Sequence, residues 1–399
     1  MRILHTSDWH LGKSIENTPR IEEQTAFSKE LTEIAVNEKV QLVVVAGDIF
    51  DTFVPPIWAE KLYYETLKSL TDKGIGVIVI SGNHDSPQKL CSAESIARKS
   101  GIVMCEYPYT IVPKGEYGLF TVTDSGEGWF SLALSNGEKA VFASLSYPSE
   151  SRIGKVIEYS EGEENIKADY NLRLKKLMED LASHFKSDSA NIMVSHLYIN
   201  GGATSDSERN FQLGGAYAVN SDTIPASCDY VALGHLHRPQ HIKECLAPTF
   251  YSGSPIGYSF SEAGYEKTVN IVDINDHKAV VKPVGIKSGK SLVSIRVNGA
   301  EEAVKWCQEH SQDENIWVEM KIVSSTAITS EQIKIMHSAC PGIVSILPQV
   351  TVEGEFYNNT QERLHIPLEE SFALFYKKKM GQDMPENIKK AFAGLRGEN

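Results

Sequence analysis

The segment that decides the fold reads VIVISGNHD and spans residues 77–85. Its four apolar residues from Val77 to Ile80 predict a short buried strand, and the polar sequence Asn83-His84-Asp85 follows close behind the end of that strand. In open α/β sheets, functional side chains lie beyond the carboxyl ends of the strands. The segment therefore predicts a layered α/β fold and indicates the edge of the sheet at which a site should lie.

The same arrangement recurs four more times in the first 260 residues. In each case a short apolar strand precedes side chains that could bind a ligand: Ile3-Leu4 precedes Asp8 and His10, Leu42 to Ala46 precedes Asp48, Ile192 to Val194 precedes His196, and Tyr230 to Leu233 precedes His235 and His237. Strands that are apolar on both faces are covered by other layers on both sides. Helical patterns at 21–38 and 59–73 lie between them. Glycines at 47, 82 and 234 are expected to let the backbone turn sharply at the strand ends.

The candidate ligands are carboxylate, imidazole and amide groups, a mixture that suits manganese, iron or zinc better than calcium or magnesium. The set is Asp8, His10, Asp48, Asn83, His196, His235 and His237. Seven ligands are too many for one ion, but they suit two ions about 3.5–4 Å apart that share a carboxylate. A lone histidine after a strand is more often an ordinary core or surface residue. Five such motifs in this order predict a dinuclear metal site.

The series D-x-H, G-D, G-N-H-D, H and G-H-x-H resembles the motifs of the calcineurin-type metallophosphoesterase family. That resemblance implies a four-layer α/β/β/α fold, in which two sheets lie between helices and the metal site lies at the strand ends. It also implies two metal ions, for which manganese is favoured. The first ion would be bound by Asp8, His10 and His237, the second by Asn83, His196 and His235, and Asp48 would bridge them.

The resemblance also assigns catalytic roles to two residues that are not metal ligands. His84 would lie near the scissile phosphate and donate a proton to the transition state or to the leaving oxygen, and Asp85 would hold its ring. General acid catalysis by a histidine is consistent with the bare chemistry of phosphate ester cleavage.

Several longer stretches are similar to the SbcD nuclease subfamily. They are MRILHTSDWHLGK (1–13), AGDIFDT (46–52), SGNHDSP (81–87), SDSER (205–209), ALGHLHRPQ (232–240) and YSGSPIGYSFSE (251–262). The similarity implies a nuclease that cleaves DNA as a double-strand exonuclease and as a single-strand or hairpin endonuclease, in DNA repair, replication and recombination. Phosphoprotein phosphatases of the same superfamily usually carry an arginine and a glycine where Asp51 is here followed by Thr52-Phe53, which disfavours that activity.

The resemblance further implies partners and a division into domains. SbcD-type proteins act with SbcC, an ATPase with a long coiled coil, and this sequence has no G-x-x-x-x-G-K-[ST] loop of its own for ATP. The expected parts are a nuclease domain over 1–270, a capping domain over 286–352 and a C-terminal helical SbcC-binding segment over 366–399. The family forms dimers, so a homodimer within a heterotetramer is expected.

The sequence pattern supports the two later parts of this division but leaves alternatives open. Strands at 291–297, 317–323 and 343–347, with helices at 300–310 and 330–339, predict a small β-α-β-α-β unit. The C-terminal segment has apolar residues at helical spacing, namely Leu368, Phe372, Phe375, Ile388, Phe392 and Leu395. These could dock on a partner or pack on the parent domain. Likewise, Trp58, Leu62, Tyr63 and Leu67 could supply a dimer surface or belong to the core.

The net charge of −13 argues by itself against a nucleic-acid partner, because phosphate binding requires a basic surface. Carboxylates that bind metal ions count as negative in this net charge, whereas the bound ions are not counted. A partner protein can also supply a positive surface. An alternative function is a metallophosphoesterase acting on small-molecule phosphodiesters or phosphoproteins. A third, a non-enzymatic scaffold on the same fold, is disfavoured because all seven ligand positions are filled. Five basic residues lie near the motifs and either contact DNA or are merely solvated: Arg20, Lys89, Arg152, Arg209 and Arg238.

Other features indicate a cytoplasmic protein that does not span a membrane. The apolar runs are far shorter than the ~20 residues that span a bilayer, and charged residues occur too early for a signal peptide. The six cysteines contain no C-x-x-C pair, so we expect them to be reduced and structural. Two further stretches have a clear composition: residues 114–138 predict hairpins, and the acidic stretch 158–169 predicts a surface loop.

Overall fold

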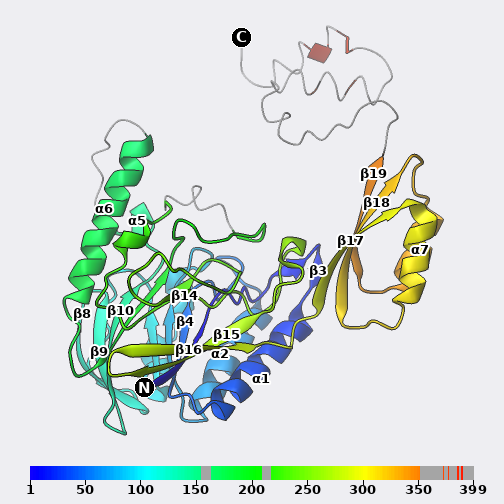
Figure 1. Ribbon diagram of the computed structural model, residues 1–399. Helices are drawn as coiled ribbons and strands as arrows, with labels where there is room; N and C mark the ends of the chain where they lie inside the picture. The colour runs from blue at the N-terminus through cyan, green and yellow to red at the C-terminus, as the bar shows by residue number, and fades with distance from the viewer. Residues whose placement is uncertain are drawn as a thin grey trace. The chain divides into compact units, whose positions relative to one another are not determined.

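The computed structural model describes residues 1–153, 163–208 and 217–350, together with the single residues 372, 376, 384, 385, 388 and 389. Two large sheets form the centre of the fold (Figure 1). The six-stranded sheet has the order β16 (Lys278–Gly285), β15 (Thr268–Asn275), β1 (Arg2–Thr6), β4 (Leu42–Ala46), β5 (Gly76–Ile80) and β6 (Ile102–Cys105). The eight-stranded sheet has the order β13 (Gln240–His241), β14 (Thr249–Tyr251), β12 (Tyr230–Gly234), β11 (Ala190–His196), β10 (Lys139–Leu145), β9 (Trp129–Leu134), β8 (Phe120–Gly126) and β7 (Gly115–Glu116).

The strands that carry the motifs are parallel within each sheet, so their carboxyl ends meet at one edge. In the six-stranded sheet β1, β4, β5 and β6 are parallel, and β15 pairs with β1 in the antiparallel sense. In the eight-stranded sheet β10, β11, β12 and β14 are parallel. Every residue of β4 and of β5 is buried, as expected for strands covered on both faces.

Three apolar cores hold four layers together and confirm the expected α/β/β/α arrangement. The first core packs α1 (Ile21–Asn37) and α2 (Ile57–Thr71) on the outer face of the six-stranded sheet. The second lies between the two sheets, and the third packs α6 (Glu163–Ala182) on the outer face of the eight-stranded sheet. Each fully buried Leu, Ile or Phe contributes about 1.5–3 kcal/mol through removal of apolar surface from water. These cores fix the positions of the strand ends at which the site lies.

The remaining short elements lie in the connections. They are β2 (Ser14–Ile15), β3 (Thr18–Pro19), α3 (Pro87–Leu90), α4 (Glu94–Ala97) and α5 (Glu150–Ile153). The hairpins expected over residues 114–138 are confirmed as β7, β8 and β9. The surface loop expected over 158–169 is wrong from Glu163 onward, where α6 begins. Tyr170, Leu174, Met178 and Leu181 recur at helical spacing and pack on the sheet, so tertiary packing outweighs the polar composition of the start of the segment.

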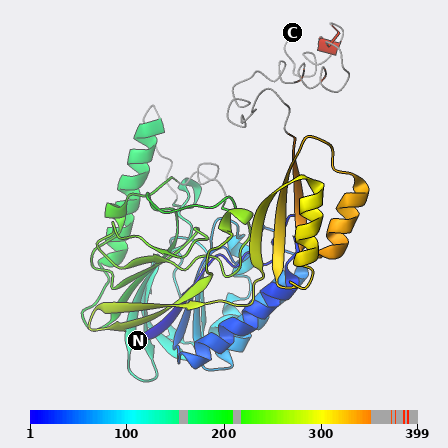
Figure 2. The same ribbon diagram turned by 45° about the vertical axis from the view of Figure 1, so that its right-hand side comes forward.

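The small β-α-β-α-β unit is confirmed by the structure. Its sheet has the order β17 (Ser291–Asn298), β18 (Ile316–Ser324) and β19 (Ile343–Val350). Helices α7 (Gly299–Glu309) and α8 (Ser330–Ala339) lie side by side on one face of this sheet (Figure 2). Its apolar core includes Val297, Cys307, Val318, Met320 and Met336. Among the described residues of this unit no group of metal-binding side chains occurs.

A buried carboxylate on α1 joins the small sheet to the large layers. Residues Met1–Ile322 and Ile328–Leu347 form one compact unit. Glu23 accepts hydrogen bonds from the indole N–H of Trp317 (2.9 Å) and from the backbone N–H of Lys290 (2.6 Å). It also forms an ion pair with the buried Arg20, which donates in turn to the carbonyl oxygen of Gly257 at 2.6 Å. Strands β15 and β16 extend the six-stranded sheet as far as Gly285, beyond the boundary expected at 270.

Several further expectations can be compared with the described residues. Leu62, Tyr63 and Leu67 belong to α2, and their side chains are buried in the core between this helix and the six-stranded sheet. These side chains are therefore not available as a dimer surface. All six cysteines are free and buried, as expected. None of the described helices has the length and apolar character needed to cross a membrane. The C-terminal segment at 366–399 lies outside the described residues apart from isolated positions.

Candidate metal centre

The seven candidate ligands are brought together at the edge where the carboxyl ends of both sheets meet. Asp8 and His10 follow β1, Asp48 follows β4, and Asn83 follows β5 on the six-stranded sheet. His196 is the last residue of β11, and His235 and His237 follow β12 on the eight-stranded sheet. All seven side chains are buried. A buried group of carboxylates and imidazoles is costly without a compensating charge, so the arrangement indicates a binding site.

The backbone that carries these ligands is strained. Asp8 (φ 53°), His10 (φ 43°), Asp48 (φ 50°) and His235 (φ 105°) all lie at positive φ, a region that non-glycine residues rarely adopt. The backbone N–H groups of Asp8 and His10 donate to the carbonyl oxygens of Gly47 and Asp48, each at 3.0 Å, which holds the two loops in register. Strain that the surrounding structure maintains is characteristic of functional sites.

The glycines at the strand ends serve two different purposes. Gly47 has φ 85°, as expected for a sharp turn. Gly82 and Gly234 are not in the left-handed region, so a positive φ is not what requires glycine at these two positions. A Cβ atom on Gly82 would lie 2.1 Å from Oδ1 of Asp48, and one on Gly234 would lie 1.9 Å from the carbonyl oxygen of Ala46. Both glycines therefore permit close approach between strand ends.

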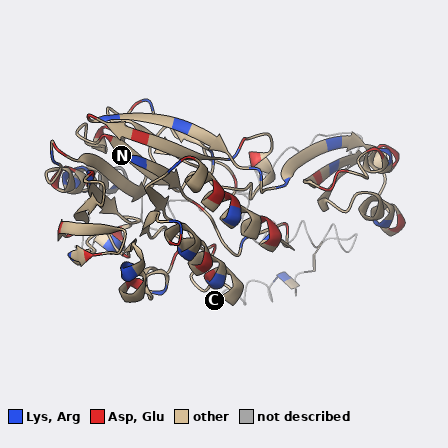
Figure 3. Cartoon of the chain, turned by 90° about the horizontal axis from the view of Figure 1, so that it is seen from below, with Lys and Arg blue, Asp and Glu red and all other residues tan. Residues whose placement is uncertain are grey.

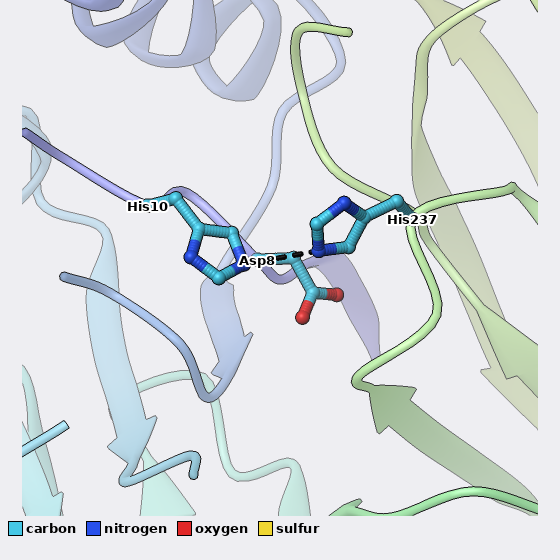
Figure 4. Close-up of side chains that lie close together, drawn as sticks. All are labelled: Asp8, His10 and His237. Carbon is cyan, nitrogen blue, oxygen red and sulfur yellow. Dashed lines mark hydrogen bonds between the residues drawn. The ribbon is translucent and has the colours of Figure 1, made fainter. Parts of the chain in front are cut away.

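Asp8, His10 and His237 form the first group of converging ligands (Figure 4). One ligand atom from each residue lies within 4.8 Å of the others. The Nε2 atoms of His10 and His237 face each other at 3.0 Å. Burial lowers the pKa of His10 to about 3, so this ring is neutral, which is the form that binds metals.

Asn83, His196 and His235 form the second group. The Oδ1 atom of Asn83 lies 2.8 Å from Nε2 of His196 and 3.1 Å from Nδ1 of His235. On its other side, Nδ1 of His196 lies 2.9 Å from the carbonyl oxygen of Ala46. A carbonyl oxygen can only accept, so Nδ1 carries a hydrogen and Nε2 is the nitrogen that faces Asn83 and the interior of the site.

Asp48 lies between the two groups. Its Oδ2 atom is 3.3 Å from Nε2 of His196 and 3.7 Å from Nε2 of His10. Burial opposes ionisation of Asp48, but the neighbouring rings, His196 foremost, hold its pKa well below the usual range. Burial likewise opposes protonation of His196, yet Asp48 raises the pKa of that ring to about 9. The carboxylate of Asp48, the residue expected to be shared by two ions, is therefore negatively charged and attracts positive charge to the middle of the site.

Two further pKa shifts support the same conclusion. Burial, reinforced by Asp48, raises the pKa of Asp8 to about 6, since a second carboxylate at this edge is disfavoured without cations. Burial also lowers the pKa of His235 to about 3, so its ring is neutral. Neutral imidazoles, an amide oxygen and carboxylates that face one another fit divalent cations of the manganese, iron and zinc type.

His84 lies beside the ligands, but its ring is held differently from the expectation. Its Nδ1 atom lies 2.6 Å from the carbonyl oxygen of Asp51, and its Nε2 atom lies 4.0 Å from Oδ2 of Asp48. The carboxylate of Asp85 instead accepts backbone N–H groups from Gly82 (2.8 Å), Phe50 (2.9 Å) and Ile49 (3.3 Å). Asp85 thus links the loop after β4 to the loop after β5 through hydrogen bonds.

Several residues around the candidate ligands were not given a positioning role from the sequence. Besides Asp51, Arg152, which was expected to contact DNA or to be solvated, donates to the carbonyl oxygens of Gly82 (2.9 Å) and Asp85 (3.2 Å). The hydroxyl of Ser207 contacts Nδ1 of His237 and donates to the carboxylate of Glu262, and these two residues come from two other loops. Asp51, Ser207 and Glu262 lie in the stretches AGDIFDT, SDSER and YSGSPIGYSFSE, so the signal was present. Polar residues in loops are too common for the sequence alone to give each a role.

The structure separates the basic residues that lie near the motifs. Arg20 is buried in an ion pair, Lys89 pairs with Glu60 at 2.6 Å, and Arg152 is bonded to carbonyl oxygens. Arg238 is exposed and its guanidinium lies 4.6 Å from the centre of the Tyr265 ring. Arg209 lies outside the described residues. Along the elements drawn in Figure 3, the positions of Lys and Arg are interspersed with those of Asp and Glu.

Comparison with known proteins gives a matching family model and several similar proteins. The family model described as calcineurin-like phosphoesterase matches residues 1–239. A protein from Bacillus subtilis (strain 168), named as the D subunit of the nuclease SbcCD, is 39% identical over 402 residues, covering 99% of this chain and 97% of the relative. A protein of the same name from Staphylococcus epidermidis is 28% identical, covering 90% of this chain and 89% of the relative. A solved dimetal phosphatase from Danio rerio is 14% identical and covers 71% of this chain and 96% of its own, with a TM-score of 0.41.

The fold, the strand-end ligands and the match over more than half of the chain define a calcineurin-like phosphoesterase, a metal-dependent hydrolase of phosphate esters. Within that class, the chain belongs to the family of the SbcD subunits of SbcCD nucleases, since it is similar to them over nearly its whole length.

Proposed function

We propose that this chain is the nuclease subunit of an SbcC–SbcD type complex and hydrolyses phosphodiester bonds of DNA at a centre that holds two divalent metal ions. It would act as a double-strand exonuclease and as a single-strand or hairpin endonuclease in DNA repair, replication and recombination. The observation that carries the proposal is the complete set of seven buried ligands, in a chain that is 39% identical to an SbcD protein of Bacillus subtilis.

In this proposal the ligands divide as their contacts suggest. Asp8, His10 and His237 would hold the first ion, Asn83, His196 and His235 the second, and Asp48 would be shared. Manganese is proposed because the resemblance to SbcD-type nucleases implies it, and the mixture of carboxylate, amide and imidazole groups also suits iron or zinc. When bound, two such ions neutralise charge on the phosphate oxygens and lower the pKa of the attacking water.

His84 would supply a proton to the leaving oxygen. Its Nδ1–H is committed to the carbonyl oxygen of Asp51, so a proton on Nε2 is the one available for transfer. Asp85 and Arg152 would keep the loop of residues 82–85 in place, because both bond to its backbone. The chain itself would thus orient the phosphate between the ligands and the ring of His84.

We also propose the assembly that the relatives' name suggests. The partner would be an SbcC-type ATPase bound by the C-terminal helical segment at 366–399. The nuclease domain, expected over 1–270, would extend to Gly285, where β16 ends, and 286–352 would be the capping domain. The active form would be a homodimer within a heterotetramer. It would work in the cytoplasm, where bacterial DNA lies.

A direct test is a nuclease assay with Mn²⁺ on linear, hairpin and circular DNA, with and without the ATPase partner and ATP. We expect cleavage of linear and hairpin DNA, and its stimulation by the partner. His84→Ala should lower the rate by about 10²- to 10⁴-fold, the usual contribution of a general acid, and should leave two ions bound per chain. Normal cleavage by this variant would contradict the role of His84.

The alternative is hydrolysis of small phosphodiesters or phosphoproteins, which the net charge of −13 favours. A chromogenic diester should be assayed beside DNA, with an exposed aspartate variant such as Asp222→Asn as the control. Cleavage of the diester without cleavage of DNA, in the presence of the partner, would favour the alternative.

A further inference from the structure

The two histidines that are candidates for different metal ions are oriented by different kinds of partner. His196 is fixed by the carbonyl oxygen of Ala46, a backbone atom of the buried strand β4. His237 is fixed by side chains from two loops, residues 205–208 and 259–262, which follow no strand of either large sheet directly. The orientation of His237 therefore depends on loops that can change without a change in the cores.

The hydrogen bonds around His237 determine which ring nitrogen is free. The hydroxyl of Ser207 donates to Oε1 of Glu262 at 2.6 Å, and its oxygen lies 2.5 Å from Nδ1 of His237. Glu262 is a buried carboxylate paired with the ammonium group of Lys267, so it can only accept. Because the single hydroxyl hydrogen is used on Glu262, Ser207 must accept a hydrogen from Nδ1 of His237. The lone pair of His237 is thereby placed on Nε2, the atom that faces His10.

The same loops also hold the backbone of His237. Oε1 of Glu208 accepts the backbone N–H of His237 at 2.8 Å, and Lys267 donates to the carbonyl oxygen of His237 at 2.9 Å. The loops are bonded to each other as well, because the backbone N–H of Asp206 donates to the hydroxyl of Ser261 at 2.9 Å. The side chain and the main chain of His237 are thus held by one connected network.

We infer that Ser207, Glu208 and Glu262 form a loop clamp that positions His237 and sets the affinity of the first metal ion, whereas the second ion is held without it. The inference rests on the proposed assignment of His237 as a ligand of the first ion. These are positioning residues, because they contact the ligand and not the substrate. Ser207 and Glu208 lie in the stretch SDSER, and Glu262 lies in YSGSPIGYSFSE. The proposed catalytic chemistry gives these two stretches no other role.

The test measures metal binding, not activity. Mn²⁺ alone is titrated into metal-free protein by calorimetry, and bound ions per chain are counted by mass spectrometry. We expect Ser207→Ala to weaken one of two ions by about 10- to 100-fold, the usual effect of a lost partner of a metal ligand, and to leave the other unchanged. Ser207→Thr keeps the hydroxyl and should bind both ions as the parent does. Ser183→Ala, an exposed serine at the end of α6 whose hydroxyl bonds only to a backbone oxygen among the contacts described, is the matched control.

The ion that weakens is identified with a second variant. His196→Gln should retain one ion, and adding Ser207→Ala should weaken that remaining ion by the same factor as in the parent. The inference is overturned if Ser207→Ala binds both ions as tightly as the parent, even with a lower melting temperature. Equal weakening of both ions, or equal effects of Ser207→Ala and Ser207→Thr, would also overturn it. A parent protein that binds no Mn²⁺ would instead contradict the proposed function.

Discussion

The strand ends of the two large sheets and the small β17–β19 unit are built from similar strands and helices but bury different residues. The large sheets gather carboxylates and imidazoles at one edge, and four of the seven candidate ligands lie at positive φ. The small unit buries an apolar core, and none of the non-glycine residues at positive φ in the described chain belongs to it. Of the two regions compared, the strand ends where metal chemistry is proposed carry the strained backbone and the buried charge, while the small unit has a relaxed backbone around an apolar core.

This difference predicts that substitutions at the strand ends of the two large sheets abolish activity without unfolding the protein. Asp48→Asn keeps the shape of the side chain but removes the charge that two ions would share. Because metal ions supply several kcal/mol of charge stabilisation, we expect Mn²⁺-dependent hydrolysis to fall by about 1,000-fold or more. The rate on DNA measures the effect, and circular dichroism checks the fold. Unchanged activity, with Asp222→Asn as the control, would contradict the shared-ligand role.

Substitutions in the core of the small β17–β19 unit should instead lower its stability without changing Mn²⁺ binding. Met320 is fully buried in the core of the small unit, so Met320→Ala should lower the free energy of unfolding of that unit by about 2–5 kcal/mol through cavity formation. Mn²⁺ affinity measured at a temperature where the variant is folded should not change. Ile335→Ala, on the partly exposed surface of α8, is the matched control and should cost little. A loss of Mn²⁺ binding in folded Met320→Ala would show that the two regions are not independent.

The stability of the metal-free protein should depend on pH through the first region. The pKa of His196 is raised from 6.5 to about 9 in the folded state, because Asp48 outweighs the effect of burial. A raised pKa means that this stabilisation is fully present below pH 6.5 and is lost as the pH rises through about 9. The melting temperature of the metal-free protein should therefore fall across that window. The fall should be smaller in His196→Gln and with saturating Mn²⁺. An equal fall in the variant would assign the effect to other groups.

The smallest effect is expected at the border of the site. Arg152 bonds to two carbonyl oxygens of the loop at 82–85, so Arg152→Ala should displace Asn83 and His84 slightly and lower kcat by about tenfold. Arg152→Lys should not restore the rate, because an ammonium group cannot replace a planar guanidinium at two acceptors. Arg98→Ala, which removes a partly exposed ion pair with Glu94, provides the control. A full rate in Arg152→Ala would show that the loop is held by its other contacts alone.

The sequence predicted the part of the site that follows strands and missed the part that does not. Apolar runs marked the ends of β1, β4, β5, β11 and β12, and the ligand candidates follow each run directly. Ser207, Glu262 and Arg152 come from loops or short helices whose positions depend on packing between distant segments, so the local pattern did not assign them a positioning role. The start of helix α6 was missed because the stretch at 158–169 is acidic and polar, whereas the apolar residues that pack on the sheet begin at Tyr170.

Strand β1 has a consequence for the biosynthesis of this enzyme. β1 lies inside the six-stranded sheet, between β4 and β15, so its pairing is complete only when Thr268–Asn275 has been made. The metal centre has the same requirement, because His10 and His237 are 227 positions apart. Pairings between such distant segments form late and slowly in folding. In a growing chain the metal centre would therefore stay incomplete until the segment that carries His237 has been made and the sheets have closed around it.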